Sequence, residues 1–302
     1  MTEKMITGTA GKCIHQDHGQ DWAMYHGDCV EVLAGLPDAS VGYSIFSPPF
    51  ASLYTYSNSP RDMGNVRNDE EFFNHFGFLI KELRRVMMPG RNVSFHCMLM
   101  PTSKERDGYI GLRDFRGDLI RAFQDGGFIY ASEVCIWKDP VTSMQRTKAL
   151  GLLHKTVRGN AAMSRQGIPD YLVTMRAPGE SAERVTHDAN EYPVSKWQVI
   201  ASPVWMDINP SDTLQYRSAR EHNDERHICP LQLQVIERGI ELWTNPGDIV
   251  LSPFAGIGSE GYVATRMNRR FVGVELKDSY YQQAVLNLIN AKAQSDLFGC
   301  DL

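Results

Sequence analysis

Three glycines spaced as G-x-G-x-x-G occur at Gly256, Gly258 and Gly261, and an acidic residue, Glu275, follows the first of them by nineteen positions. Glycines allow the backbone between a strand and a helix to approach a ligand closely, and a carboxylate that ends the next strand can accept hydrogen bonds from two ribose hydroxyls. A tight turn without any ligand can carry the same letters. The combination of glycines and carboxylate favours a site for an adenosine-containing cofactor.

The acidic Glu260 distinguishes between the cofactors that such a loop can hold. A dinucleotide places its phosphates against the first N–H groups of the helix, where a Glu260 carboxylate would repel them. S-adenosylmethionine has no phosphate and carries a positive sulfonium, so it tolerates an acidic neighbour. The loop therefore favours S-adenosylmethionine as the cofactor.

A second motif, Ser47-Pro48-Pro49-Phe50, follows the apolar run of residues 41–46. Paired prolines lack N–H groups and have a fixed φ, so they present carbonyl oxygens in a rigid geometry. If a serine hydroxyl and such a carbonyl accept the two N–H bonds of a nucleobase amine, the nitrogen becomes more tetrahedral and its lone pair can point at a methyl group. Phe50 offers an aromatic face for a base that has left the double helix. The motif thus indicates chemistry on the exocyclic amine of a flipped base.

Apolar runs and helical periodicities alternate around both motifs and must position them. Strands are expected at residues 41–46, 91–100, 128–137, 249–251 and 270–275. Helices are expected at residues 69–88, 114–125, 230–243, 259–267 and 279–293. Such alternation is typical of an α/β fold in which helices cover both faces of a mostly parallel sheet.

The alternation stops between residues 138 and 229, which are rich in Pro, Asn, Ser and Gly. Residues 138–176 contain seven lysines and arginines against two aspartates. A charge run is often only a solvated surface, but here basic side chains alternate with Asn, Ser and Gln, which can contact phosphates and base edges together. We therefore predict contact with double-stranded DNA from this segment and from the loop after Phe50. The residues expected to contact DNA are Tyr54, Arg61, Arg146, Lys148, Lys155, Arg158 and Arg165.

The composition excludes several other classes of protein. The 302 residues carry a net charge of −5, with 42% hydrophobic and 22% charged residues, which argues against a disordered chain or a coiled coil. No run of about 18 apolar residues exists to span a membrane, and the first residues lack the apolar core of a secretory signal. Six scattered cysteines fit reduced thiols, so we expect a cytoplasmic protein. Cys13, His15 and His18 are expected in a flexible tail, and no metal site is predicted.

Together these motifs resemble those of the beta-class amino-methylating DNA methyltransferases, which modify N6 of adenine or N4 of cytosine. In that class a (D/N/S)-P-P-(Y/F) motif comes first, a target-recognition region follows, and an F-x-G-x-G cofactor motif comes last. Here Ser47-Pro48-Pro49-Phe50 precedes the basic segment, and Phe254-Ala255-Gly256-Ile257-Gly258 follows it. Further matches are His26-Gly27-Asp28-Cys29, the stretch from Leu83 to Gly90, Gly127-Phe128, and Phe271-Val272-Gly273-Val274-Glu275.

The resemblance implies a Rossmann-like α/β fold with a doubly wound, mostly parallel, seven-stranded sheet and an inserted target-recognition region. It divides the chain into a catalytic half at residues 1–138, the insert at 139–226 and a cofactor-binding half at 227–302. Ser47, Pro48, Pro49 and Phe50 would hold the target base. S-adenosylmethionine would be bound by Asp28 on its adenine side, by Glu275 at its ribose hydroxyls, and by His227, Pro230, Ser252, Phe254, Ala255, Gly256 and Gly258.

Two features depart from the usual patterns of the class, Ser252 in the cofactor motif and Ser-Pro-Pro-Phe as the acceptor motif, and several properties stay open. Ser252 stands where an aspartate usually opens the cofactor motif. The serine of the acceptor motif favours cytosine N4 over adenine N6 and excludes neither. The sequence leaves open whether the chain serves in restriction-modification or is an orphan or phage enzyme. It also leaves open a homodimer and a companion restriction endonuclease. The alternatives are an NAD-dependent oxidoreductase and a catalytically silent DNA-binding regulator on the same fold.

Overall fold

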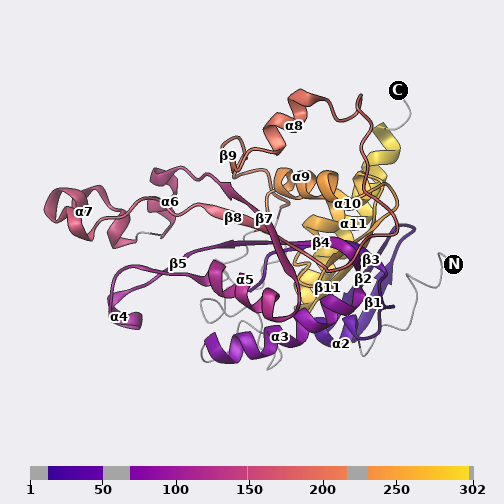
Figure 1. The fold of residues 1–302 in the computed structure, drawn as a ribbon, viewed down its shortest axis with the longest axis horizontal. Helices are drawn as coiled ribbons and strands as arrows, with labels where there is room; N and C mark the ends of the chain where they lie inside the picture. The colour runs from indigo at the N-terminus through magenta and orange to yellow at the C-terminus, as the bar shows by residue number, and fades with distance from the viewer. Residues whose placement is uncertain (1–12, 50–68, 148, 216–229, 299–302) are drawn as a thin grey trace.

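Nine strands form one sheet in the computed structural model, which describes residues 13–49, 69–147, 149–215 and 230–298 (Figure 1). Their spatial order is β1-β2-β11-β10-β3-β4-β8-β7-β9. The strands are β1 (His15–His18), β2 (Trp22–His26), β3 (Val41–Phe46), β4 (Met87–Met98), β7 (Ile129–Ile136), β8 (Asp170–Arg176), β9 (Val204–Trp205), β10 (Ile249–Ser252) and β11 (Arg270–Glu275). Two shorter strands, β5 (Met100–Pro101) and β6 (Leu112–Arg113), pair with each other outside this sheet.

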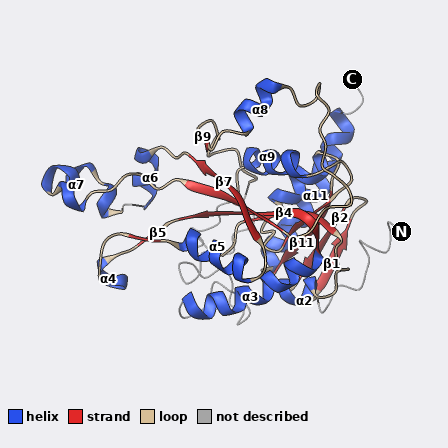
Figure 2. Cartoon of the chain, viewed as in Figure 1, coloured by secondary structure: helices blue, strands red, loops and turns tan. Residues whose placement is uncertain are grey.

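Parallel pairing joins the five central strands β2, β11, β10, β3 and β4. Strand β8 runs antiparallel between β4 and β7, while β9 extends β7 in parallel. Helices α2 (Cys29–Leu33), α3 (Asp69–Val86) and α5 (Phe115–Asp125) pack on one face, and α9 (Leu233–Trp243), α10 (Ser259–Arg266) and α11 (Asp278–Phe298) on the other (Figure 2). The predicted doubly wound, mostly parallel α/β class is confirmed.

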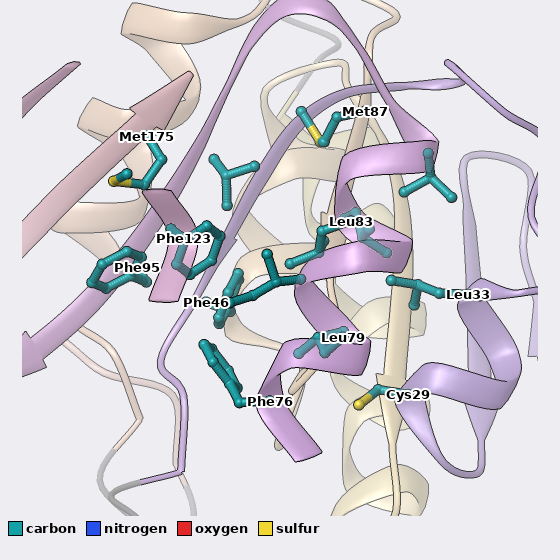
Figure 3. Close-up of a cluster of buried hydrophobic side chains, with 14 of the residues drawn as sticks. Cys29, Leu33, Phe46, Phe76, Leu79, Leu83, Met87, Phe95, Phe123 and Met175 are labelled. Carbon is teal, nitrogen blue, oxygen red and sulfur yellow. The ribbon is translucent and has the colours of Figure 1, made fainter. Parts of the chain in front are cut away.

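Aromatic rings fill the core between α3, α5 and the sheet. Phe123 of α5 stacks on Phe95 of β4 with ring centroids 5.0 Å apart, and Phe76 of α3 meets Phe123 edge-on at 5.9 Å. Figure 3 shows these rings together with Leu79 and Leu83 of α3, and all five side chains are fully buried. Burial of a side chain of this size contributes about 1.5–3 kcal/mol. This layer fixes the position of β4, whose carboxyl end reaches the site described below.

The edges of the sheet differ from the sequence-based prediction. The sheet has nine strands in place of the predicted seven, because the short strands β1 and β9 lie at its two edges. The prediction of a flexible tail at His15 and His18 is wrong, since β1 pairs antiparallel with β2 and places His15 opposite His26. In addition, α3 ends at Val86 and β4 begins at the next residue, so Pro89 lies inside a strand.

The predicted insert of residues 139–226 also needs correction, because two strands of the sheet come from it. β8 lies between β4 and β7, in the interior of the sheet. The run Tyr171–Met175 is apolar except for Thr174, and it lies in a segment whose other residues show no regular pattern, so the sequence offers no reason to separate this strand from the insert. The other described residues of the segment, within 139–147, 149–169, 177–203 and 206–215, lie outside the sheet.

Part of this segment projects away from the body of the protein. Between β7 and β8 the chain forms α6 (Pro140–Thr147) and α7 (His154–Gly159), which extend beyond the ends of both strands (Figure 1). Two further short helices are α4 (Lys104–Asp107), between β5 and β6, and α8 (Val194–Ile200), before β9. None of the helices in the described ranges combines the length and apolar character of a membrane span.

Candidate active site

The two sequence motifs follow neighbouring parallel strands. β3 ends directly before Ser47, and β10 ends at Ser252. Leu251 pairs with Ser44, whose Oγ donates a hydrogen bond to the Leu251 carbonyl at 2.9 Å. From β3 the chain crosses to β4 on one side, whereas from β10 it crosses to β11 on the other. The motifs therefore flank the topological switch point, where open α/β sheets bind their ligands.

The glycine-rich loop joins β10 to α10 in a conformation that requires glycine. Gly256 has a φ of +52° and Gly258 a φ of +83°, both in the left-handed region. A Cβ on Gly256 would meet nothing within 4 Å, so the space beside it is open. Gly261 has a different role, because a Cβ there would lie 2.4 Å from the Phe271 ring. The first two glycines shape the loop, and the third allows α10 to pack closely on β11.

The Glu275 carboxylate, at the end of β11, is oriented by backbone donors. The Gly256 N–H donates to Oε2 at 2.9 Å, and the Lys277 N–H donates to Oε1 at 2.8 Å. These two bonds from different backbone donors orient the carboxylate. Glu275 therefore lies against the glycine loop, as the sequence predicted.

Asp28 lies next to Glu275 because the Gly27 N–H donates to the Glu275 carbonyl at 3.0 Å. Asp28 is the N-cap of α2, and its Oδ1 accepts hydrogen bonds from the N–H groups of Val30 and Glu31 at 2.9 and 3.1 Å. Two predicted cofactor residues from opposite ends of the chain are thus brought together at the carboxyl ends of β2 and β11.

Ser252 is fully buried, and its Oγ has no hydrogen-bond partner among the described residues. The Phe254 ring lies 5.7 Å from the Phe46 ring, so the cofactor loop also contacts the strand that leads to Ser47. A buried hydroxyl without a partner, oriented carboxylates and the open side of the glycine loop fit a cationic ligand that bears hydroxyls. S-adenosylmethionine has this chemistry.

Glu260 lies in the first turn of α10 and is 4% exposed. Burial, and to a lesser degree the charge of Glu275, raises the pKa of Glu260 to about 8. The carboxyl is therefore mostly protonated at neutral pH. The repulsion of phosphates expected from the sequence is weak, so the case for S-adenosylmethionine depends on the other residues of the loop.

Ser47 is half-buried, and a chain of polar groups lies behind it. The Ser47 Oγ is 3.2 Å from Nδ1 of His96, and Nε2 of the same ring is 2.9 Å from Oδ2 of Asp170. Lys138 forms an ion pair with that carboxylate. Sequence reasoning missed His96 and Asp170, although a histidine within the apolar run of β4 is a signal that could have identified the first. Pro48 is buried and Pro49 half-buried beside Ser47.

The described basic residues that were expected to contact DNA lie between β7 and β8, outside the sheet. Lys155 and Arg158 are exposed on α7, and Arg146 belongs to α6. Arg165 is half-buried, and burial lowers its pKa.

Pro230 is half-buried just before α9. Five predicted site residues lie outside the described residues: Phe50, Tyr54, Arg61, Lys148 and His227. Within the described ranges, no cluster of His, Cys, Asp and Glu side chains could hold a metal ion.

A family model described as DNA methylase matches residues 43–286, a range that contains both motifs. Type II methyltransferase M.BglII of Bacillus subtilis is 25% identical over 262 residues, which cover 85% of this chain and 66% of the relative. Type II methyltransferase M.BamHI of Bacillus amyloliquefaciens is 24% identical over 259 residues, which cover 84% of this chain and 54% of the relative. The chain thus spans just under two thirds of the first relative and about half of the second.

Solved structures share the fold. The PvuII DNA methyltransferase, described as cytosine-N4-specific, superposes with a TM-score of 0.66 at 18% identity and 95% coverage of both chains. A DNA modification methylase homologue of Thermus thermophilus, in complex with S-adenosyl-L-methionine, also gives a TM-score of 0.66, at 22% identity, over 89% of this chain and 93% of that one. These structures support the Rossmann-like architecture derived above.

Proposed function

The chain belongs to the DNA methylase family, and from that premise we propose that it transfers a methyl group from S-adenosylmethionine to an exocyclic amine of a base in double-stranded DNA. The observation that carries the proposal is the placement of Ser47 and the glycine loop after neighbouring strands, on either side of the switch point. A base amine held at the first motif would face a cofactor held at the second. The reaction requires this proximity.

The acceptor motif would bind and polarise the amine. S-adenosylmethionine supplies a methyl group on a positively charged sulfur. The Ser47 hydroxyl and the carbonyl of the rigid Pro48 segment would accept the two N–H bonds of the amine, which directs the nitrogen lone pair toward the donor. Phe50 would stack on the flipped base. The transfer is direct and uses no covalent enzyme intermediate.

The cofactor would be held by the residues that the structure gathers around the glycine loop. Glu275 would accept hydrogen bonds from the ribose hydroxyls, Asp28 would lie on the adenine side, and the Ser252 hydroxyl would take the place of the usual aspartate. His227 and Pro230, before α9, would complete the site. The open space beside Gly256 would be filled by the ligand.

The target base is proposed to be cytosine, methylated at N4, because the acceptor motif begins with serine and the PvuII enzyme with the same overall fold is described as cytosine-N4-specific. The exposed basic residues on α7 and other residues of the 139–226 segment would recognise the DNA. Relatives named type II methyltransferases support a role in restriction-modification, which implies a companion endonuclease. The described cysteines Cys13, Cys29, Cys97 and Cys135 are unpaired, which supports a cytoplasmic protein.

The decisive experiment incubates the protein with labelled S-adenosylmethionine and random-sequence DNA, and then identifies the modified base and its context. We expect N4-methylcytosine at a defined sequence. Binding of DNA without methyl incorporation would favour a silent regulator, and binding of NAD in place of S-adenosylmethionine would favour an oxidoreductase.

Two variants separate the roles of the two motifs. Ser47→Ala should lower turnover strongly while S-adenosylmethionine binds with nearly unchanged affinity in calorimetry. Glu275→Ala should weaken that binding, and the exposed Glu183→Ala serves as its control. Unchanged turnover of Ser47→Ala would contradict the assignment.

A further inference from the structure

We propose that His96 and Asp170 form a proton relay behind Ser47, so that the proton released by the methylated amine leaves through the Ser47 hydroxyl to His96. The inference rests on the proposed function and extends it to residues that no sequence motif includes. Ser47 touches the substrate in this scheme, while His96 and Asp170 are positioning residues that act through it.

Three separate strands bring the relay together. Ser47 follows β3, His96 lies near the carboxyl end of β4, and Asp170 is the first residue of β8. β8 runs antiparallel to β4, and this direction places Asp170 opposite Met98, two residues beyond His96. The distances of 3.2 Å from Ser47 to the ring and 2.9 Å from the ring to Asp170 make one continuous path. The path begins at the half-buried serine and ends at a carboxylate that is 2% exposed.

The charges along this path define which atoms donate. Burial on its own would raise the pKa of Asp170, but pairing with His96 and Lys138 outweighs it and lowers the pKa below its ordinary value. Asp170 is therefore an ionised acceptor, and His96 Nε2 carries the proton that it accepts. In the neutral ring Nδ1 is then the acceptor, so Ser47 donates its O–H to His96. This leaves the lone pairs of Ser47 Oγ to receive an N–H of the base.

The same arrangement can complete the reaction. The amine nitrogen forms a bond to the methyl carbon, the carbon–sulfur bond breaks with its electron pair left on sulfur, and the nitrogen then holds one proton too many. That proton passes to Ser47 Oγ as the serine hydroxyl proton passes to His96 Nδ1. The imidazolium formed is stabilised by the Asp170 carboxylate and later releases its proton to water. Positioned proton transfer of this kind contributes about 10²–10⁴-fold to a rate.

Two charged groups reach His96 from other elements. Asp170 of β8 contacts the ring, and Lys138, after β7, pairs with Asp170. The next residue of β4, Cys97, is influenced also by Arg116 of α5 and Glu133 of β7, which are paired at 2.9 Å. Burial raises the pKa of the Cys97 thiol well above its ordinary value, so it stays neutral over the range in which histidines titrate. Asp170 is the carboxylate that contacts the His96 ring directly.

The first test reads the imidazole itself by ¹⁵N NMR of the protein without cofactor or DNA. Comparison with His96→Asn assigns the His96 signal. We expect Nε2 protonated and Nδ1 unprotonated in the neutral ring, because Asp170 accepts the Nε2 proton. The opposite tautomer would overturn the relay.

The second test measures single-turnover methyl transfer against pH. His96→Asn keeps a polar group near Ser47 but cannot accept a proton, so its rate should fall by about 100-fold and should lose the acidic limb that the relay predicts for the wild type. The matched control is His75→Asn, at an exposed position on α3. It should keep the wild-type rate of methyl transfer and the acidic limb of the pH profile. Equal pH profiles in the wild type and His96→Asn would show that His96 takes no part in proton transfer, and the proposed relay would be wrong. Absence of methyl transfer in the wild type would instead contradict the proposed function.

Discussion

Glu260 provides a sharp test of the electrostatics under the glycine loop. Its carboxyl has an ordinary pKa of 4.5, which burial raises to about 8 in the folded protein. Between these two values the native state keeps a proton that the unfolded state has released, so the free energy of unfolding must fall as the pH rises through this window. Each pH unit between the two pKa values corresponds to about 1.4 kcal/mol, which makes the full loss about 5 kcal/mol. A glutamine at this position has no proton to lose.

The assay is urea denaturation of the wild type and of Glu260→Gln, without cofactor, at several pH values between 5 and 8.5. We expect the two proteins to have similar free energies of unfolding at the acidic end. As the pH rises, the free energy of unfolding of the variant should exceed that of the wild type by a growing amount, which reaches several kcal/mol at pH 8.5 and about 5 kcal/mol at most. For the control Glu183→Gln, at an exposed position, the difference in free energy of unfolding from the wild type should stay the same at every pH. If the Glu260→Gln difference is equally constant, the carboxyl does not titrate in this window and the argument from burial is refuted.

Three further changes follow from the packing and charge of the described residues. Gly261→Ala places a Cβ 2.4 Å from the Phe271 ring and should destabilise the protein by about 1–3 kcal/mol, read as a lower denaturation midpoint; an unchanged midpoint would mean that α10 shifts freely. Arg91→Met leaves Asp248, now 2.5 Å from the guanidinium, largely buried without its charged partner and should cost about 3–5 kcal/mol by the same assay. Lys155→Gln on α7 should weaken DNA binding and reduce the slope of log affinity against log salt by about 0.9, and an identical slope would exclude a phosphate contact at this residue.

The elements around the two motifs could be predicted because their sequences carry complete local signals. β3, β10 and β11 are buried on both faces, so they form short apolar runs, and a proline or glycine marks an end of β3 and of β10. The Ser47 motif and Glu275 directly follow or end such strands, and their placement therefore follows from the strands. Asp28 was located by resemblance, and its position next to Glu275 depends on a pairing of β2 with β11 between distant parts of the chain.

No local sequence signal indicates the contact between His96 and Asp170. The two residues are 74 positions apart, and their contact depends on which strands become neighbours in the sheet. The charge count of residues 138–176 was misleading in one respect, since Lys138 pairs with Asp170 behind Ser47 and does not belong to the surface expected to face DNA. The amino-acid sequence shows that a side chain is basic. Only the tertiary structure shows whether its charge is already neutralised.

The direction of β8 explains why a search restricted to strand ends overlooks part of this site. In a parallel sheet the ligand-facing edge collects residues that follow strands, as Ser47 and Glu275 do. An antiparallel strand presents its first residue at that same edge, so Asp170, which begins β8, reaches the carboxyl ends of β3 and β4. A buried carboxylate at the start of an otherwise apolar strand is costly unless it is paired, and here His96 and Lys138 pair with it. The cost of burying Asp170 is therefore itself an argument that the carboxylate serves the serine in front of it, since an apolar residue would satisfy the fold alone.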